Sequence, residues 1–162
     1  MIMPRMAPHP SDRACGESAS PAPPHRLAIR VYYEDTDFSG VVYHASYLRF
    51  LERGRTEFLR ALGIEHRGIF GKGGADAFHF VVRAMTIEFL KPALMDDELC
   101  IETQPSATGG ASIDVMQKIR RGCEVLLTAK VRIAVVAGGK ARRIPARISA
   151  KLKASTVAGL DV

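Results

Sequence analysis

Cysteine is scarce in this sequence of 162 residues, and the few cysteines are widely spaced. The three cysteines form no C-x-x-C pair, and no histidine lies at metal-ligand spacing from any of them. This pattern indicates neither a disulfide framework nor a zinc site. Cys100 and Cys123 fall within or beside strand patterns, where a small buried thiol is the ordinary interpretation rather than a nucleophile.

Long apolar runs are also missing. The longest purely apolar stretches, such as residues 133–137, fall far short of the roughly 20 residues that a bilayer span requires, so no transmembrane helix is predicted. The N-terminal segment lacks the continuous apolar stretch of a secretory signal, so we expect a cytoplasmic protein. There is no G-x-S-x-G motif and the chain is too short for an α/β-hydrolase core, which excludes that class of serine hydrolase.

Large apolar side chains are rare in residues 1–25, which are rich in Pro, Ser and Ala. Such a composition cannot compensate for the entropy of ordering, so we predict a disordered N-terminal arm over these residues. The rest suits one globular domain, because the chain is 47% hydrophobic and short. We place this domain at residues 26–147 and a basic tail at residues 148–162.

The formal charge of +6 comes largely from the C-terminal third of the chain. Such a cluster usually forms a solvated tail, and the alternatives are a surface for an anionic ligand, such as a phosphate-bearing cofactor, or for nucleic acid. No aromatic residues interleave these charges to stack bases, so a nucleic acid partner is not expected. The clustered residues are Lys140, Arg142, Arg143, Arg147, Lys151 and Lys153.

The predicted domain begins with apolar residues that alternate at strand period from residue 26 to residue 32. After His44 the apolar residues recur at helical spacing, which predicts one long amphipathic helix. Gly63 is expected to end this helix, because a left-handed residue is favoured there. Gly54 lies inside the helix on its apolar side, which indicates either close packing against a sheet or a glycine that the helix merely tolerates.

Strand patterns dominate the remainder of the domain, after a glycine-rich stretch at residues 68–77 that predicts a loop. In the first of these patterns, one face is expected to carry Val81, Met85, Ile87 and Phe89. The four runs with strand character are residues 80–90, 98–104, 111–119 and 125–136. A strand, a long helix and at least four consecutive strands predict an α+β domain, with an antiparallel sheet packed on one helix.

One short stretch, YYEDTDFSGVVYH at residues 32–44, combines acids with apolar residues just before the helix. In an extended segment, Asp35 and Asp37 would point to the same side of the chain. A structural interpretation is that these acids favour the positive N-terminus of the helix, although Asp37 lies too far from it to be a plain N-cap. A catalytic interpretation is that Gly40 lets the backbone turn, so that amides at the helix start form an anion hole facing Asp37.

That second arrangement suits acyl transfer, in which a carboxylate acts as a general base on water or attacks the carbonyl carbon itself. Metal binding is the weaker interpretation, because hard cations need more oxygen ligands and first-row metals need more histidines than this segment supplies. His44 is either a hydrogen-bonded structural residue or a group that helps to polarise a carbonyl.

The stretch VYYEDTDFSGVVYHASYLRFLERGRTEFLRALGI resembles the signature of hotdog-fold acyl-CoA thioesterases of the 4-hydroxybenzoyl-CoA thioesterase type. It is most similar to the bacterial branch associated with the Tol-Pal envelope system. The similarity continues through FVVRAMTIEFLKPALMDDEL and covers roughly residues 26–147. The resemblance implies a curved antiparallel sheet wrapped around one long central helix. It also implies dimers or tetramers with active sites at subunit interfaces.

The resemblance also implies roles for individual residues. Asp37 would be the catalytic carboxylate, and Asp35 a supporting residue. The amide of His44 would bind the thioester oxygen, and its side chain would assist. The residues implied in substrate binding are Gly40, Val41, Val42, Tyr43 and Tyr47, of which the two tyrosines would line the acyl pocket. The E-x-x-R spacing of Glu52 and Arg55 matches the family and implies structural support.

The expected activity is hydrolysis of acyl-CoA thioesters, with short-chain aliphatic or aromatic acyl groups, to free acid and CoA, without a metal or an organic cofactor. An acyl carrier protein is a second candidate partner, and a homodimer or homotetramer is expected. The alternative is a non-catalytic hotdog protein that binds acyl carriers or envelope-system partners. The candidates for contact with the CoA phosphates are the basic residues near strand ends, Arg120, Arg121, Arg142 and Arg143.

Overall fold

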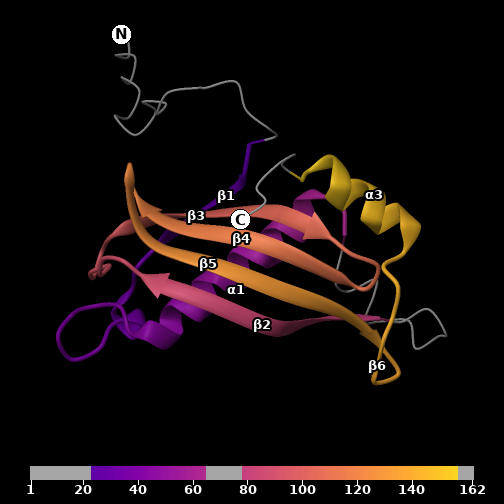
Figure 1. Cartoon of the computed structure of the whole chain (residues 1–162). Helices are drawn as coiled ribbons and strands as arrows, with labels where there is room; N and C mark the ends of the chain where they lie inside the picture. The colour runs from indigo at the N-terminus through magenta and orange to yellow at the C-terminus, as the bar shows by residue number, and fades with distance from the viewer. Residues whose placement is uncertain (1–22, 65–77, 157–162) are drawn as a thin grey trace, which may run out of the picture.

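The computed structural model describes residues 23–64 and 78–156 of the chain. One antiparallel sheet packs against the long helix α1, and the shorter helix α3 lies at one end of α1 (Figure 1). The strands follow the spatial order β1-β3-β4-β5-β2, and β6 pairs with β5. The elements are β1 (His25–Arg30), the 3-10 helix η2 (Tyr33–Asp35), α1 (His44–Ala61), β2 (His79–Phe89), β3 (Glu98–Thr108), β4 (Ser112–Arg121), β5 (Glu124–Ala137), β6 (Lys140–Ala141) and α3 (Ala146–Ala154).

This order of elements confirms the predicted α+β class and the hotdog arrangement of a curved antiparallel sheet around one long helix. Two predicted segments fall largely outside the described residues. They are the N-terminal arm, of which only residues 23–25 are described, and the glycine-rich loop at 68–77. His25 was assigned to the arm but is the first residue of β1. No helix in the described ranges is long and apolar enough to cross a membrane.

The C-terminal end of α1 is closed by backbone hydrogen bonds. Gly63 has a φ of 68°, so the left-handed residue predicted at the helix end is confirmed. The Gly63 amide donates to the Arg60 carbonyl at 2.8 Å, and the Ile64 amide donates to the Leu59 carbonyl at 3.0 Å. Both Ile64 and Leu59 are buried, which adds the apolar contact that accompanies this Schellman arrangement.

Gly54 is the residue at which α1 comes closest to the sheet. A Cβ at this position would lie 2.6 Å from Ile101 Cγ2 and 3.0 Å from Thr103 Oγ1, so the predicted close packing is confirmed. A buried polar group lies beside this contact, because Gln117 donates to Thr103 Oγ1 at 2.9 Å and accepts from Arg55 Nη1 at 2.9 Å. The helix therefore contacts the sheet closely at Gly54, and hydrogen bonds from Arg55 to Gln117 and from Gln117 to Thr103 hold the two together beside it.

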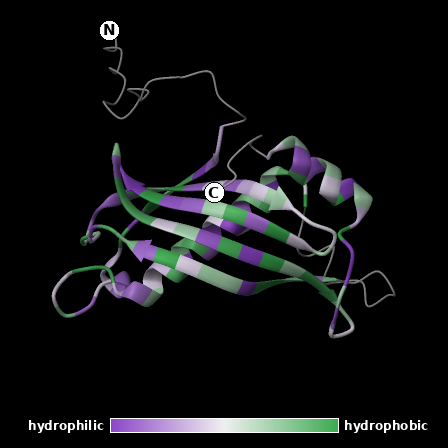
Figure 2. Cartoon of the chain, in the orientation of Figure 1, coloured by the Kyte–Doolittle hydropathy of each residue, from purple (hydrophilic) through white to green (hydrophobic). Residues whose placement is uncertain are grey.

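The strands alternate apolar and polar residues, as the banding of β4 and β5 in Figure 2 shows. On β2 the prediction that Val81 shares a face with Met85 is wrong. The register of β2 against β5 shifts between Val82 and Ala84, and such a β-bulge reverses the facing of the residues on one side of it. As a result Phe80, rather than Val81, packs against the core together with Met85.

The C-terminal region packs more extensively than expected. The boundary predicted at residue 147 falls inside α3, whose Ile148 and Leu152 are buried. The expected solvated tail is therefore in part a docked amphipathic helix, because two apolar residues one turn apart share a face. Lys151 also donates from Nζ to the Leu62 carbonyl at 2.6 Å, which satisfies an acceptor at the end of α1.

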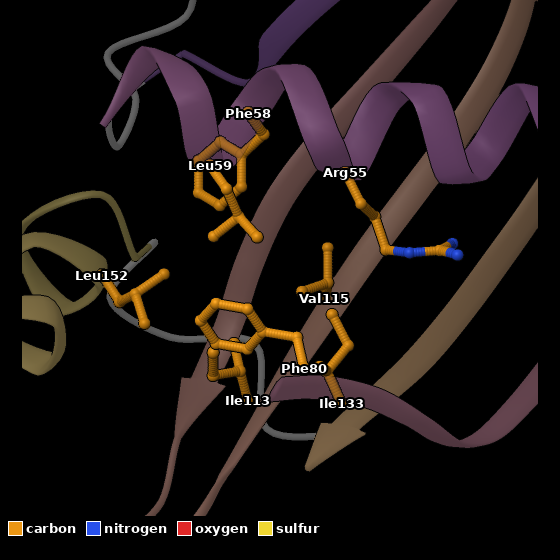
Figure 3. A pocket seen from close by; sticks show the side chains of 8 residues that line it. All are labelled: Arg55, Phe58, Leu59, Phe80, Ile113, Val115, Ile133 and Leu152. Atoms are coloured by element: carbon orange, nitrogen blue, oxygen red, sulfur yellow. The ribbon is translucent and has the colours of Figure 1, made fainter. Parts of the chain in front are cut away.

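A small apolar pocket lies where α1, the sheet and α3 meet (Figure 3). Phe58 and Leu59 of α1 point toward Phe80 of β2, Leu152 closes one side, and the Arg55 guanidinium is directed away. The volume of the pocket is about 10 Å³, close to that of a single water-sized sphere. It is a packing void and cannot hold an acyl group in this conformation.

Candidate active site

The segment before α1 folds back on itself as a short hairpin. Thr36 forms an antiparallel bridge with Val42, and the Asp37 amide donates to the Val41 carbonyl at 2.9 Å. The Gly40 amide donates to the Asp37 carbonyl at 3.0 Å, and Gly40 has a φ of 78°. A Cβ at Gly40 would meet nothing within 4 Å, so the backbone conformation rather than space favours glycine here. The turn predicted at Gly40 is confirmed.

Asp37 lies at the first position of this turn, and its side chain is exposed. Its Oδ1 accepts two hydrogen bonds from Ser39, one from the amide at 2.8 Å and one from the hydroxyl at 2.5 Å. The pKa of the Asp37 carboxyl is lowered below its usual value, chiefly by the Ser39 hydroxyl and then by the Ser39 amide. Loss of hydration opposes this shift, and the Val41 backbone adds a smaller lowering effect. Asp37 is therefore a carboxylate at neutral pH.

Asp35 has a different environment from Asp37, although only one residue separates them. Asp35 is 4% exposed, its Oδ2 accepts a hydrogen bond from the Tyr32 amide at 3.0 Å, and its carbonyl accepts one from the Tyr43 amide at 2.9 Å. The prediction that both carboxylates point to one side is wrong, because residues 33–35 form a 3-10 helix instead of an extended strand. In this geometry Asp35 braces the segment and Asp37 is presented to solvent.

The N-terminus of α1 follows directly after the hairpin. Tyr43 precedes the helix with φ −64° and ψ 135°, and no side chain caps the helix start. Three nearby amides are already used, since Val42, Tyr43 and Ser46 donate to Ala93, Asp35 and Tyr43 carbonyls. The amides of His44 and Ala45 are at the positions where a helix offers no internal acceptor, and the helix dipole adds positive potential there. This end of α1 can accept an anion.

The predicted substrate-binding residues are arranged in two groups. Gly40 ends the turn, and Val41 and Val42 form the return strand of the hairpin. Tyr43 and His44 are exposed at the helix start, with ring centroids 4.2 Å apart. Tyr47 is 4% exposed, and burial raises the pKa of its hydroxyl. That hydroxyl accepts a hydrogen bond from the Ala93 amide at 2.9 Å. In this chain Tyr47 holds a neighbouring loop.

The loop that Tyr47 holds was not singled out from the sequence. It follows β2 and lies against the hairpin, because the Val42 amide donates to the Ala93 carbonyl at 2.9 Å and Val41 bridges Leu94. Asp97 fixes the loop internally, since its Oδ2 accepts from the Leu94 amide at 2.8 Å. The only sequence signal for this loop is the proline at position 92 that interrupts the strand pattern.

The four basic residues proposed for CoA phosphates lie at two ends of the sheet. Arg121 pairs with Asp97 at 2.7 Å and is therefore at the end that carries the hairpin and its loop. Its neighbour Arg120 pairs with Glu102 at 3.0 Å. Arg142 and Arg143 follow β6, which pairs with the far end of β5. Within one chain, only the first pair lies near the candidate site.

Several large apolar side chains are exposed around the hairpin and its loop. A single exposed residue of this kind is ordinary, but a group around one segment marks an interaction or binding surface. The group includes aromatic residues from the hairpin and aliphatic residues from the loop that contacts it. Its members are Tyr32, Tyr33, Phe38, Tyr43, Leu90, Leu94 and Met95.

Comparison with known proteins is consistent with this geometry. Residues 31–154 match the model of the thioesterase-like superfamily. The acyl-CoA thioesterase YbgC of Haemophilus influenzae is 41% identical over 116 residues, which are 72% of this chain and 83% of that protein. The acyl-CoA thioester hydrolase YbgC of Escherichia coli is 42% identical over 131 residues, which are 79% of this chain and 95% of that protein.

A solved structure shows the same similarity in three dimensions. The crystal structure of a probable thioesterase from Bartonella henselae is 48% identical to this chain, with a TM-score of 0.72. The match covers 75% of this chain and 98% of the Bartonella protein. The family model spans well over half of the sequence, including the hairpin, α1 and the whole sheet from β2 onward. The chain therefore belongs to the thioesterase-like superfamily.

Proposed function

We propose that this protein hydrolyses acyl-CoA thioesters to a free acid and CoA, with Asp37 as the catalytic carboxylate. The observation that carries the proposal is an exposed, ionised carboxylate on a hydrogen-bonded turn, seven residues before a helix N-terminus that no side chain caps. A thioesterase needs these two elements, one to act on water or the carbonyl carbon and the other to hold the developing oxyanion. The names of the YbgC relatives support the choice of acyl-CoA.

The proposed chemistry follows one of two routes. In the first, Asp37 takes a proton from water while the water oxygen attacks the thioester carbonyl. In the second, Asp37 itself attacks and forms an anhydride, which water then hydrolyses. In both routes the oxyanion meets the His44 amide, the carbon–sulfur bond breaks, and the CoA thiolate leaves and takes a proton from solvent. The lowered pKa of the Asp37 carboxyl keeps it ionised for either route.

The acyl group is proposed to be short and aliphatic, or aromatic. Support comes from the exposed aromatic rings of Phe38 and Tyr43, which flank Asp37 and the helix start. Two further residues have proposed roles. His44 is proposed to assist through its side chain, and Tyr47 to support the acyl pocket by holding the loop at Ala93.

An acyl carrier protein is proposed as a second carrier of the acyl group, beside CoA.

The protein is proposed to act as a homodimer or homotetramer in the cytoplasm. Support comes from β2, which within the described residues pairs only with β5 and so lies at an edge of the sheet. An eleven-residue edge strand with exposed Val81, Val82 and Phe89 is an aggregation hazard unless something covers it. A second copy of the chain, paired through the same edge, would cover it symmetrically. Size-exclusion chromatography coupled to light scattering tests the oligomeric state, and a monomer at micromolar concentration would contradict the proposed dimer or tetramer.

Thiol release from a panel of acyl-CoA thioesters tests the activity. The panel contains acetyl, butyryl, octanoyl, palmitoyl, benzoyl and 4-hydroxybenzoyl thioesters, each with the uncatalysed rate as reference. We expect turnover of at least one short-chain or aromatic member far above that rate, and weaker turnover of the palmitoyl member. Binding of every member without release of thiol would contradict hydrolysis and favour a non-catalytic acyl-binding protein.

A further inference from the structure

Ser39 makes the closest contacts with the Asp37 carboxylate. Its amide and its hydroxyl both donate to Oδ1, at 2.8 Å and 2.5 Å. A distance of 2.5 Å from a hydroxyl to an oxygen is typical of a hydrogen bond to an ionised carboxylate. Both of these donors act on a single oxygen, so they restrict the orientation of the carboxylate.

We propose that Ser39 is a positioning residue that holds the Asp37 carboxylate by Oδ1 and thereby presents Oδ2 as the oxygen that meets water or the thioester carbon. This rests on the proposed thioesterase activity of Asp37. A carboxylate has two equivalent oxygens until its surroundings distinguish them. With Oδ1 held by two donors, Oδ2 is the oxygen to which Ser39 does not donate.

The hairpin backbone makes Ser39 a firm anchor. The residue lies between Asp37 and Gly40, whose carbonyl and amide are joined by a 3.0 Å hydrogen bond. The Gly40 carbonyl also accepts from the Met95 amide at 3.3 Å, which ties the turn to the loop after β2. An exposed aspartate without such contacts samples several rotamers, and reaction requires one of them. The hydroxyl therefore reduces the orientational cost of the reaction.

The pKa of the Asp37 carboxyl is lowered mainly by the same residue. The Ser39 hydroxyl is the largest cause of its lowered pKa, and the Ser39 amide is the second. Apart from tyrosines, the titratable groups on the elements next to the hairpin are Glu34 and Asp35 in η2, His44 in α1, and Lys91, Asp96 and Asp97 in the loop. None of these is among the causes. Removal of the hydroxyl raises the pKa of Asp37, yet the group stays ionised at neutral pH. A loss of rate at pH 7 then reports orientation and not protonation.

Two substitutions separate the hydroxyl from the rest of the turn. Ser39→Ala removes the hydroxyl and keeps the amide, and Ser39→Thr keeps both at an exposed position. We expect Ser39→Ala to lower kcat about tenfold at pH 7 with KM within about twofold, and Ser39→Thr to restore most of kcat. Ser155→Ala, at the end of α3, removes a hydroxyl bonded to the Lys151 carbonyl and serves as the control with unchanged kcat.

Carboxyl-carbon NMR titration of Asp37 supplies a readout that does not need turnover. We expect the Asp37 pKa to rise in Ser39→Ala and to stay near the wild-type value in Ser39→Thr. An unchanged kcat and an unchanged Asp37 pKa in Ser39→Ala, with Asp37→Asn inactive, would overturn the role of Ser39 alone. A kcat in Ser39→Thr as low as in Ser39→Ala would also overturn it. A wild-type protein that releases no thiol would instead overturn the thioesterase activity and this role with it.

Discussion

The two ends of α1 are built in opposite ways. At the C-terminal end, Gly63 and Ile64 close the last turn through the backbone, and Lys151 of α3 donates to the Leu62 carbonyl. At the N-terminal end, no side chain caps the helix, and Tyr43 and His44 are exposed. One end has its hydrogen-bonding groups satisfied and the other keeps amides available. The proposed chemistry therefore belongs to the N-terminal end of the helix, and substitutions at the C-terminal end should lower stability without changing kcat.

The largest effect is expected from deletion of one amide at the N-terminal end. His44 is the first helical residue and follows an extended Tyr43, so His44→Pro fits the backbone and removes the N–H that is proposed to bind the oxyanion. We expect kcat to fall about 100- to 1000-fold, as for loss of an oxyanion donor. His44→Ala is the control, because it removes the imidazole and keeps the amide. Equal losses in the two variants would assign the effect to the ring.

The next largest effect is expected from Tyr47, which holds the loop beside the N-terminal end of α1 through its hydrogen bond with the Ala93 amide. Tyr47→Phe leaves the Ala93 amide without its acceptor in a buried position, so we expect a loss of about 1–3 kcal/mol in the free energy of unfolding. Because Ala93 belongs to the loop that holds the hairpin, kcat/KM should fall as well. Urea denaturation and thiol release, at one fixed protein concentration, measure the two effects. A stable variant with full activity would show that this hydrogen bond is dispensable.

A smaller effect is expected from Gly63 at the closed end. Gly63→Ala forces a side chain into a left-handed conformation, which should lower the free energy of unfolding by about 1 kcal/mol, since the stiffer unfolded chain offsets part of the strain. The N-terminal end is unaffected, so kcat should stay at the wild-type value. Urea denaturation measures the loss of stability. A fall in kcat would contradict the expectation that the C-terminal end of α1 contributes to stability and not to the reaction.

The smallest effect is expected from Lys151. Lys151→Met keeps the apolar stem and removes the hydrogen bond to the Leu62 carbonyl, for an expected loss of about 0.5–1 kcal/mol in the free energy of unfolding. Thermal denaturation of this variant beside Gly63→Ala tests the order of the two effects. Lys153→Met is the matched control, since Lys153 is exposed on the same helix. An identical loss in both variants would assign the effect to general charge and not to the cap.

The parts of the fold that were predictable are those governed by local periodicity. The helix that begins at His44 and ends before Gly63, and the packing at Gly54, follow from side-chain spacing and glycine chemistry alone. The bulge at Arg83 and the docking of α3 depend on partners far away in the sequence. A pattern read along a strand cannot reveal a register shift that the neighbouring strand imposes.

The candidate site was predictable for a similar reason and to a similar extent. The turn at Gly40 and the helix that follows place Asp37 before an open helix end, and the local sequence is enough to expect this. The burial of Asp35 was missed, because the 3-10 helix that turns it inward has no strong sequence signal. The role of Ser39 was missed as well, since its two contacts with Asp37 appear only when the turn is built.

The most direct test of the central claim compares wild type with Asp37→Asn in thiol release from the best thioester of the panel, at saturating concentration. Asn is nearly isosteric with Asp, and the side chain is exposed, so the melting temperature should not change. The account predicts a fall in kcat of about a hundredfold or more with the fold intact. A folded Asp37→Asn protein that retains wild-type kcat would contradict it.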